Sequence, residues 1–345
     1  MPKVFTIDDT WNEMPWFNTG GTREKRYLQG PDGNFYYFKK SQNRPGKYYK
    51  YEFWNEIIAF DLGMMLGFNV LRYDIAIDRE DSIGCICKSM IDNEKQELIE
   101  GVKYIQAFAP DYNPAKREHQ NRYTFHMIEH SLAQAKLSHY VNEIIKLIVF
   151  DSIIGNGDRH QENWATIKHH YDILPLLNEI DKSKEGSWWQ RRKIKYYKWW
   201  ISRKQRIEEK TEVLAIEIFS PIYDSGSCLG RELTDEKVTL YLSDNNALEA
   251  YLNRGKSEIH WNSKKVKHLE LIKNLKNSEH SDFVTEIIKK SCVNFSPDKM
   301  LNLVNQIDMA LPEHMAEFKI PADRKELIVK MVTLRIQRLR ELSND

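Results

Sequence analysis

The chain has 345 residues, of which 51 are lysine or arginine and 50 are aspartate or glutamate, for a formal net charge of +1. This length suits two domains, or one domain with two lobes, and a hydrophobic content of 41% is enough for a sizeable core. A net charge so close to zero argues against a protein whose whole surface coats nucleic acid or an acidic membrane, and leaves room for a local basic patch.

The first 90 residues are predicted to form strands and one helix. Residues 34–41 (NFYYFKKS) are aromatic and β-prone, and residues 52–68 (EFWNEIIAFDLGMMLGF) are apolar at helical spacing. Residues 70–77 (VLRYDIAI) alternate apolar and polar side chains, which predicts a half-buried strand, and residues 83–90 (IGCICKSM) predict another.

After residue 90 the sequence becomes helical. Residues 132–154 (LAQAKLSHYVNEIIKLIVFDSII) predict one long apolar helix, and residues 323–342 repeat apolar side chains every three or four positions. A small β-rich part followed by a larger α-rich part predicts an α+β fold with two lobes, at residues 1–90 and 91–345, joined by a hinge near residues 88–93.

Polar residues gather directly after the predicted long helix, in GNGDRHQENW (155–164). A carboxylate at Asp158 followed five residues later by a carboxamide at Asn163 is the arrangement of a kinase catalytic loop. The carboxylate accepts a proton from the attacking hydroxyl, and the amide oxygen is a hard ligand suited to Mg²⁺. The competing interpretation is an Asp–Arg pair that ties the helix end to a loop.

A kinase also needs a second metal carboxylate, which Asp224 supplies in FSPIYDSGSCLG (219–230), where small residues allow the chain to turn. An ordinary Asp-Ser-Gly turn is the alternative. Lys39 on the predicted strand is the candidate phosphate lysine, and Glu56 on the following helix is its candidate partner. A solvent-facing lysine and a surface glutamate are the alternatives, and Glu52, one turn earlier, competes with Glu56.

Adjacent glycines, Gly20 and Gly21, precede the first predicted strands and allow backbone N–H groups to approach phosphate closely. A flexible surface turn is the alternative for Gly-Gly alone. The order glycine loop, lysine, glutamate, Asp…Asn and aspartate is that of a kinase, and five individually weak signals in this order form a strong one.

At these residues the sequence resembles the HipA-like serine/threonine kinases, bacterial kinases with a two-lobed protein-kinase-like fold, some of which are toxins of toxin–antitoxin systems. The segments GGTREK, YFKKS, NEIIAFDLGMMLGFNV, GNGDRHQENW and SPIYDSGSCL carry the resemblance, which covers roughly residues 18 to 230. The glycine loop lies so early that the chain is closer to the short members, of the CtkA or HipT type. The order D-R-H-x-x-N also occurs in phosphoinositide kinases.

The resemblance implies ATP and Mg²⁺ as cofactors and assigns a role to each residue. Asp158 is implied as catalytic base, Asn163 and Asp224 as Mg²⁺ ligands, Lys39 as the ligand of the ATP phosphates, and Glu56 as the residue that orients Lys39. Adenine is expected against the hinge backbone at Ser89, Met90 and Ile91.

The substrate stays open at this stage. A protein with a Ser/Thr acceptor, or this chain's own Thr19 or Thr22, is the first candidate, and an antitoxin is a candidate partner. A lipid or small-molecule kinase and a pseudokinase that only binds are the alternatives. The loop with Arg254 and Lys256 is predicted to be solvated rather than phosphate-binding.

One segment, residues 188–210, holds nine Lys/Arg, two Glu and six Trp/Tyr. This composition suits RNA or an acidic protein, although an amphipathic helical insert is favoured, and nucleic acid is not expected as a partner.

Four cysteines without a C-x-x-C pair favour reduced thiols in a cytosol. No signal peptide and no membrane span are predicted, so a cytoplasmic protein is expected. Secretion as an effector without a signal peptide is the alternative.

Overall fold

The computed structural model describes residues 1–15, 25–92, 95–172 and 213–344. The segment 188–210 and the candidate glycine-loop residues Thr19, Gly20, Gly21 and Thr22 lie outside the described residues. The described chain falls into two compact units. The first comprises Met1–Ser89, Glu100–Trp164 and Pro221–Asp345, and the second comprises Met90–Ile99 and Ala165–Ser220. The lobes predicted at residues 1–90 and 91–345 are a different division and stay a prediction.

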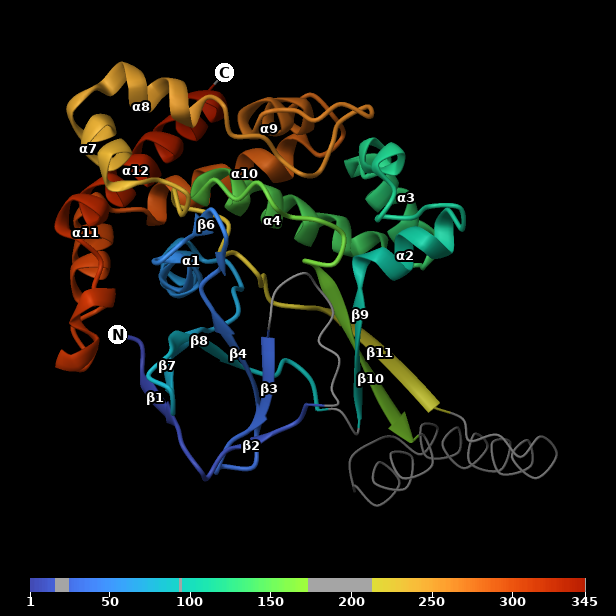
Figure 1. The fold of residues 1–345 in the computed structure, drawn as a ribbon. Coiled ribbons are helices and arrows are strands. Elements are labelled where there is room, and N and C mark those ends of the chain that lie inside the picture. The colour runs from blue at the N-terminus through green and yellow to red at the C-terminus, as the bar shows by residue number, and fades with distance from the viewer. Residues whose placement is uncertain (16–24, 93–94, 173–212, 345) are drawn as a thin grey trace, which may run out of the picture. The chain divides into compact units, whose positions relative to one another are not determined.

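Eleven strands are found among the described residues (Figure 1). They are β1 (Val4–Ile7), β2 (Asn12–Glu13), β3 (Lys25–Gln29), β4 (Phe35–Lys40), β5 (Asn43–Arg44), β6 (Lys47–Tyr48), β7 (Asp74–Asp78), β8 (Ile83–Lys88), β9 (Gln96–Glu100), β10 (Ala165–Asp172) and β11 (Val213–Phe219).

The described helices follow mainly after residue 100. The α-helices are α1 (Glu52–Leu66), α2 (Gly101–Phe108), α3 (Phe125–Gln134), α4 (Val141–Ile154), α7 (Asp235–Ser243), α8 (Asn245–Leu252), α9 (His268–Lys276), α10 (Ser281–Asn294), α11 (Pro297–Gln306) and α12 (Ala322–Asn344). Short 3-10 helices are η1 (Arg117–Arg122), η2 (Ser138–Tyr140) and η3 (Glu313–Phe318). The predicted α+β fold class, with a β-rich N-terminal region and a helical C-terminal region, is confirmed.

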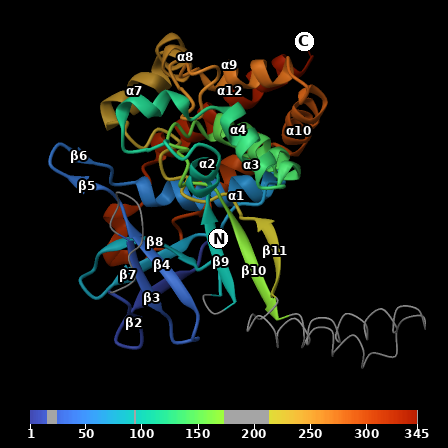
Figure 2. The same ribbon diagram turned by 90° about the vertical axis from the view of Figure 1, so that its right-hand side faces the viewer.

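The N-terminal sheet has six strands in the order β1-β7-β8-β4-β3-β2, and it curls visibly in Figures 1 and 2. Strand β1 is parallel to β7, and the other neighbours are antiparallel. Register places Lys39 between Lys25 on β3 and Cys85 on β8. Gly84 is required there, since an added Cβ would lie 2.3 Å from the carbonyl oxygen of Lys39.

Both faces of this sheet are covered. Helix α1 contacts β8 on one face, and a cluster that includes Ile7, Trp11, Leu28 and Phe38 fills the other. Strand β7 is therefore buried at all five positions. The half-buried strand predicted from its alternation is wrong, because Ala76 packs in this second cluster and the Asp74 and Asp78 carboxylates, at the ends of the strand, pair with arginines.

The helical region is built around α4, which is apolar almost all round and contacts α3, α9, α10 and α12. One long helix over residues 132–154 was the expectation, and it is wrong. Lys136 adopts a positive φ of 62°, which an α-helix cannot contain, so α3 ends at Gln134 and α4 begins at Val141. The predicted C-terminal helix is present as α12.

The second unit contains a three-stranded sheet in the order β11-β10-β9. Strands β10 and β11 pair antiparallel over seven residues each, from Thr166↔Phe219 to Asp172↔Val213. None of the described helices is both long and apolar enough to cross a membrane.

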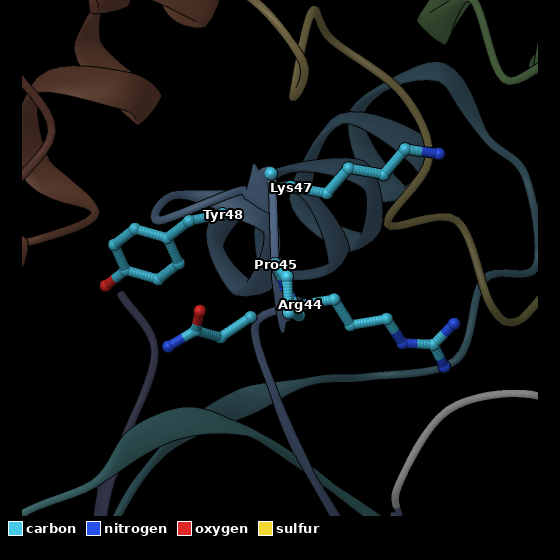
Figure 3. Close-up of a pocket in the computed structure, with 6 residues that line it drawn as sticks. Arg44, Pro45, Lys47 and Tyr48 are labelled. Carbon is cyan, nitrogen blue, oxygen red and sulfur yellow. The ribbon is translucent and has the colours of Figure 1, made fainter.

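Two hollows lie on the N-terminal region. One, of about 800 Å³, opens beside Trp11 and Leu28, and on its rim Arg26 and Lys40 each form an ion pair with Asp78. The other, of about 550 Å³, is lined by the β5–β6 hairpin alone, and Figure 3 shows Arg44, Pro45, Lys47 and Tyr48 around it. Neither includes a predicted site residue.

Candidate active site

The predicted catalytic loop begins where α4 ends. Gly155 terminates the helix with a left-handed φ of 71°, and its N–H donates to the Asp151 carbonyl at 2.8 Å. An added Cβ on Gly155 would lie 2.2 Å from the Arg335 guanidinium, so glycine is needed for this close approach. The chain therefore leaves the buried helix at a fixed angle, and Asp158 follows three residues later.

Arg159 anchors the loop from inside. Its Nε and Nη2 each donate to the Asp151 carboxylate at 2.9 Å, and Nη1 donates to the Asn163 carbonyl at 3.0 Å and to the Tyr223 carbonyl. Burial by itself lowers the pKa of this guanidinium, but the adjacent Asp151 carboxylate outweighs burial and raises it. One permanently charged side chain thus ties α4, the loop and the segment before Asp224 together. The Asp–Arg tie that competed with the kinase interpretation is real and coexists with it.

Asp158 and Asn163 are held in one loop. The Asn163 Nδ2 donates to the Asp158 carbonyl at 2.8 Å, and the Ser227 hydroxyl donates to Asp158 Oδ2 at 3.0 Å. The amide nitrogen of Asn163 is thereby used within the loop, and its Oδ1 is the atom suited to a cation. The two residues, five apart in sequence, lie together with Ser227 from the Asp224 segment.

Lys39 lies between two carboxylates. Its Nζ is 2.6 Å from Glu56 Oε1 and 2.5 Å from Asp224 Oδ1, and its side chain is buried. Lys25, which follows the candidate glycine loop, is 3.6 Å from Asp224 Oδ2. Burial of an ammonium is costly unless it is paired, and here it is paired twice.

The rival partner of Lys39, Glu52, is engaged elsewhere. Its carboxylate contacts the Arg231 guanidinium and accepts the Gln42 N–H at 2.8 Å. Glu56 presents its second oxygen to the Ser225 N–H at 2.7 Å. The structure therefore brings Glu56, and not Glu52, to Lys39.

Asp224 is positioned by its backbone. Its φ of 54° lies in the left-handed region, which is uncommon for a residue other than glycine and is enriched at functional sites. Its N–H donates to the Tyr73 hydroxyl at 3.4 Å. Burial raises the pKa of Tyr73, so this hydroxyl stays neutral beside the carboxylates.

The oxygen donors of this cluster fit a hard cation. The Asp224 carboxylate and the Asn163 Oδ1 are the ligand types that Mg²⁺ takes in proteins, and the Lys39 ammonium beside them suits phosphate oxygens. Asn163 and Asp224 would hold the ion, and Lys39 would contact the phosphates.

The candidate adenine residues are only partly placed. The Ser89 N–H donates to the Phe35 carbonyl at 2.8 Å, which extends the β4–β8 pairing. Met90 and Ile91 belong to the second unit. The adenine contact there stays a prediction.

Three supporting residues were missed by the sequence analysis. Lys25 and Ser227 are single polar residues with no local signal, since only the fold brings them to Asp224 and Asp158. Asp151 had a signal, because a carboxylate in a strongly apolar helix, seven residues before Asp158, requires a buried cation as partner.

Comparisons with known proteins support the fold. No family model matches the chain, and no curated protein matches it by sequence. The Helicobacter pylori proinflammatory kinase CtkA superposes with a TM-score of 0.67 at 15% identity, covering 98% of this chain and 98% of that chain.

Two weaker likenesses support no further argument. HipA, from the complex of the Shewanella oneidensis MR-1 toxin–antitoxin system with HipB and operator DNA, has a TM-score of 0.49 at 11% identity, over 98% of this chain and 67% of that chain. The Golgi casein kinase has a TM-score of 0.32 at 12% identity, over 99% of this chain and 73% of that chain. The chain has the protein-kinase-like α+β fold of CtkA, and the sequence resemblance to short kinases of the CtkA type is confirmed at the level of the fold.

Proposed function

We propose that this chain is a Mg·ATP-dependent serine/threonine protein kinase of the HipA-like type. The observation that carries the proposal is the buried Lys39 ammonium held between Glu56 and Asp224. A phosphate-binding lysine, the glutamate that orients it and a metal-binding aspartate are the parts that phosphoryl transfer requires. Burial of three charges is costly, and a role in binding phosphate and metal accounts for that cost.

Each residue has one role in the proposed reaction. Asp158, fixed by the Ser227 hydroxyl, orients the acceptor hydroxyl and takes its proton as the acceptor oxygen bonds to the γ-phosphorus. The bond from the γ-phosphorus to its bridging oxygen breaks, and ADP leaves. Bound Mg²⁺ would neutralise charge on the phosphates, with Asn163 and Asp224 as its protein ligands.

The acceptor is proposed to be a protein hydroxyl, either on another protein or on this chain. The support is the resemblance of the motifs to the HipA-like serine/threonine kinases, together with a base that requires only a correctly placed alcohol. CtkA, which shares the fold, is described as a proinflammatory kinase. The antitoxin partner stays a prediction without a structural argument.

The test is phosphoryl transfer from γ-labelled ATP into a host lysate, followed by mass spectrometry. Wild type is expected to place phosphate on Ser or Thr of itself or of a lysate protein, and Asp158→Ala to lose about 10²–10⁴-fold in rate. An unchanged unfolding midpoint in the variant shows that its fold is intact.

The other outcomes count against the proposal in different ways. Label confined to the lipid or small-molecule fraction would establish the alternative substrate class. Nucleotide binding without any label in any fraction would establish a pseudokinase.

A further inference from the structure

A hairpin next to the catalytic loop carries an unusual pair of like charges. Lys256 and Lys267 face each other in an antiparallel bridge. The Ser257 N–H donates to the Val266 carbonyl at 3.0 Å and the His268 N–H to the Gly255 carbonyl at 3.3 Å, so the two lysines form the non-hydrogen-bonded pair between these bonds. Side chains approach each other most closely in pairs of this kind, and like charges placed there repel.

No carboxylate in the described part of the chain forms an ion pair with either lysine. Residues 254–267 contain five cations and one acid, Glu258. That acid pairs with Lys265, and neither Lys256 nor Lys267 takes part in an ion pair among the described residues. Arg254 and Lys264 are exposed as well. Arg254 and Lys256 are exposed to solvent, as predicted, and the segment that carries Lys256 forms an ordered, basic hairpin.

The hairpin is rigid enough to present these charges. Asn262 and Ser263, with φ values of 47° and 61°, form a tight two-residue turn between Trp261 and Lys264, which exchange backbone hydrogen bonds of 3.0 and 2.9 Å. Trp261 stacks on Phe125 with ring centroids 6.0 Å apart. The backbone of the hairpin therefore holds the two lysines opposite each other.

The hairpin also lies against the residue that precedes the proposed base. A Cβ added to Gly157 would lie 3.1 Å from the Lys256 carbonyl oxygen, and Asp158 follows directly. A protein substrate whose acceptor hydroxyl reaches Asp158 would therefore bring the residues on either side of that acceptor near this hairpin.

We propose that the Lys256/Lys267 hairpin is the docking surface for an acidic segment of the protein acceptor, next to the phosphorylated hydroxyl. This inference rests on the proposed function and specifies its substrate class. Charge complementarity selects the occupant, because glutamate, aspartate or phosphorylated side chains would neutralise the repelling pair. Trp261 is packed against Phe125 and His126, so it offers no platform for stacking a nucleic-acid base.

Direct binding tests the surface without depending on turnover. The probe is a fluorescein-labelled peptide with one serine flanked on both sides by glutamate, and its match carries lysine in place of glutamate. The acidic peptide is expected to bind the full chain more tightly than the basic one, and to be released towards 1 M salt, where the screening length is about 3 Å. The double variant Lys256→Glu/Lys267→Glu is expected to bind it at least about tenfold more weakly, on the scale of two exposed ion pairs.

A control variant separates the effect of the two lysines from the effect of the protein's net charge. Lys299→Glu reverses an exposed charge on α11 and is expected to bind the acidic peptide as wild type does. Equal binding of the two peptides, or an unchanged affinity in the double variant, overturns the proposal. So does a single-stranded RNA of equal charge that binds more tightly through the same two lysines.

A thermal shift with Mg·ATP on the same samples keeps the two proposals apart. Acidic-peptide binding without a nucleotide shift would sink the kinase assignment and leave the surface standing. A thermal shift with Mg·ATP, without a preference for the acidic peptide, would support the kinase assignment and overturn the docking surface.

Discussion

Lys39 is the residue on which the candidate site depends. Its two carboxylate partners lie 17 and 185 residues away along the chain, so a single ammonium joins β4, α1 and the Asp224 segment. The hydrogen bond from the Ser225 N–H to Glu56 links α1 and the Asp224 segment a second time. Removing one member of a buried charged cluster typically destabilises a protein by about 3–5 kcal/mol, so variants of Lys39 report on folding as well as on chemistry.

Asp158 and Asp224 offer a cleaner separation of roles. We expect Asp224→Ala to weaken Mg-dependent ATP binding at least about tenfold, equivalent to ~1.4 kcal/mol, because Asp224 is the proposed metal carboxylate. Asp158→Ala is expected to keep binding and lose turnover, because Asp158 is the proposed base for the acceptor hydroxyl and not a metal ligand. Calorimetric titration of Mg·ATP into both variants is the measurement, with equal far-UV spectra as the check on folding. If Asp158→Ala abolishes binding while Asp224→Ala retains it, the two assignments are reversed.

At the scale of elements, local sequence patterns predicted most of the strands, helices and loops that carry the candidate site residues. Strand β4, helix α1 and strand β8 lie where residue spacing and β-prone composition predicted them, and the loop after α4 lies at the polar stretch 155–164. The failures have a tertiary cause. The break at Lys136 between α3 and α4 has no glycine or proline to mark it, and β7 is buried on both faces because the sheet curls around a second apolar cluster.

Helix α9 begins with a buried histidine whose effect on stability can be measured. Its first residue, His268, has an Nε2 with no partner among the described residues. Burial, aided by the charges of Arg335 and Lys265, lowers the pKa of His268 to about 3. The helix N-terminus disfavours a cation in addition. The folded protein thus keeps this imidazole neutral where the unfolded chain, with a histidine pKa of about 6.5, protonates it.

Stability should therefore fall as the pH drops below about 6.5, because the unfolded state then binds the extra proton, and the contribution of His268 is lost progressively down to its folded pKa of about 3. Between pH 7 and pH 5 one such histidine accounts for about 2 kcal/mol. Urea unfolding at both pH values is expected to show this loss in wild type and in a His314→Leu control, since His314 is exposed. His268→Leu should lose less by about that amount, and an identical loss in all three proteins would contradict the assignment.

Across the whole molecule, the sequence was enough to propose the residues of the candidate site and their order along the chain, because the kinase motifs are local. It did not predict the contacts that hold them. Ser227 on Asp158, Lys25 on Asp224 and the Lys256 hairpin beside Gly157 join segments that only the fold brings together. Asp151 could be recognised in the sequence as an acid inside an apolar helix. Its partner Arg159 was considered only as part of an Asp–Arg pair that competed with the kinase interpretation.

The division into two units gives the last prediction. Lys39, Glu56, Asp158, Asn163 and Asp224 all belong to the first unit. Mg·ATP that binds the Lys39 cluster in the folded protein and not in the unfolded chain would stabilise the folded state by ~2.7 kcal/mol at a concentration 100 times the dissociation constant. Hydrogen exchange read by mass spectrometry, with and without Mg·ATP, is the measurement.

Protection is expected in β4, α1 and the 155–164 loop, and not in the paired residues of β10 and β11, which belong to the second unit. Asp224→Ala provides the control, because it removes the proposed metal ligand and should remove the protection with it. Protection confined to β10 and β11 would place the nucleotide outside the Lys39 cluster and refute the site proposed here.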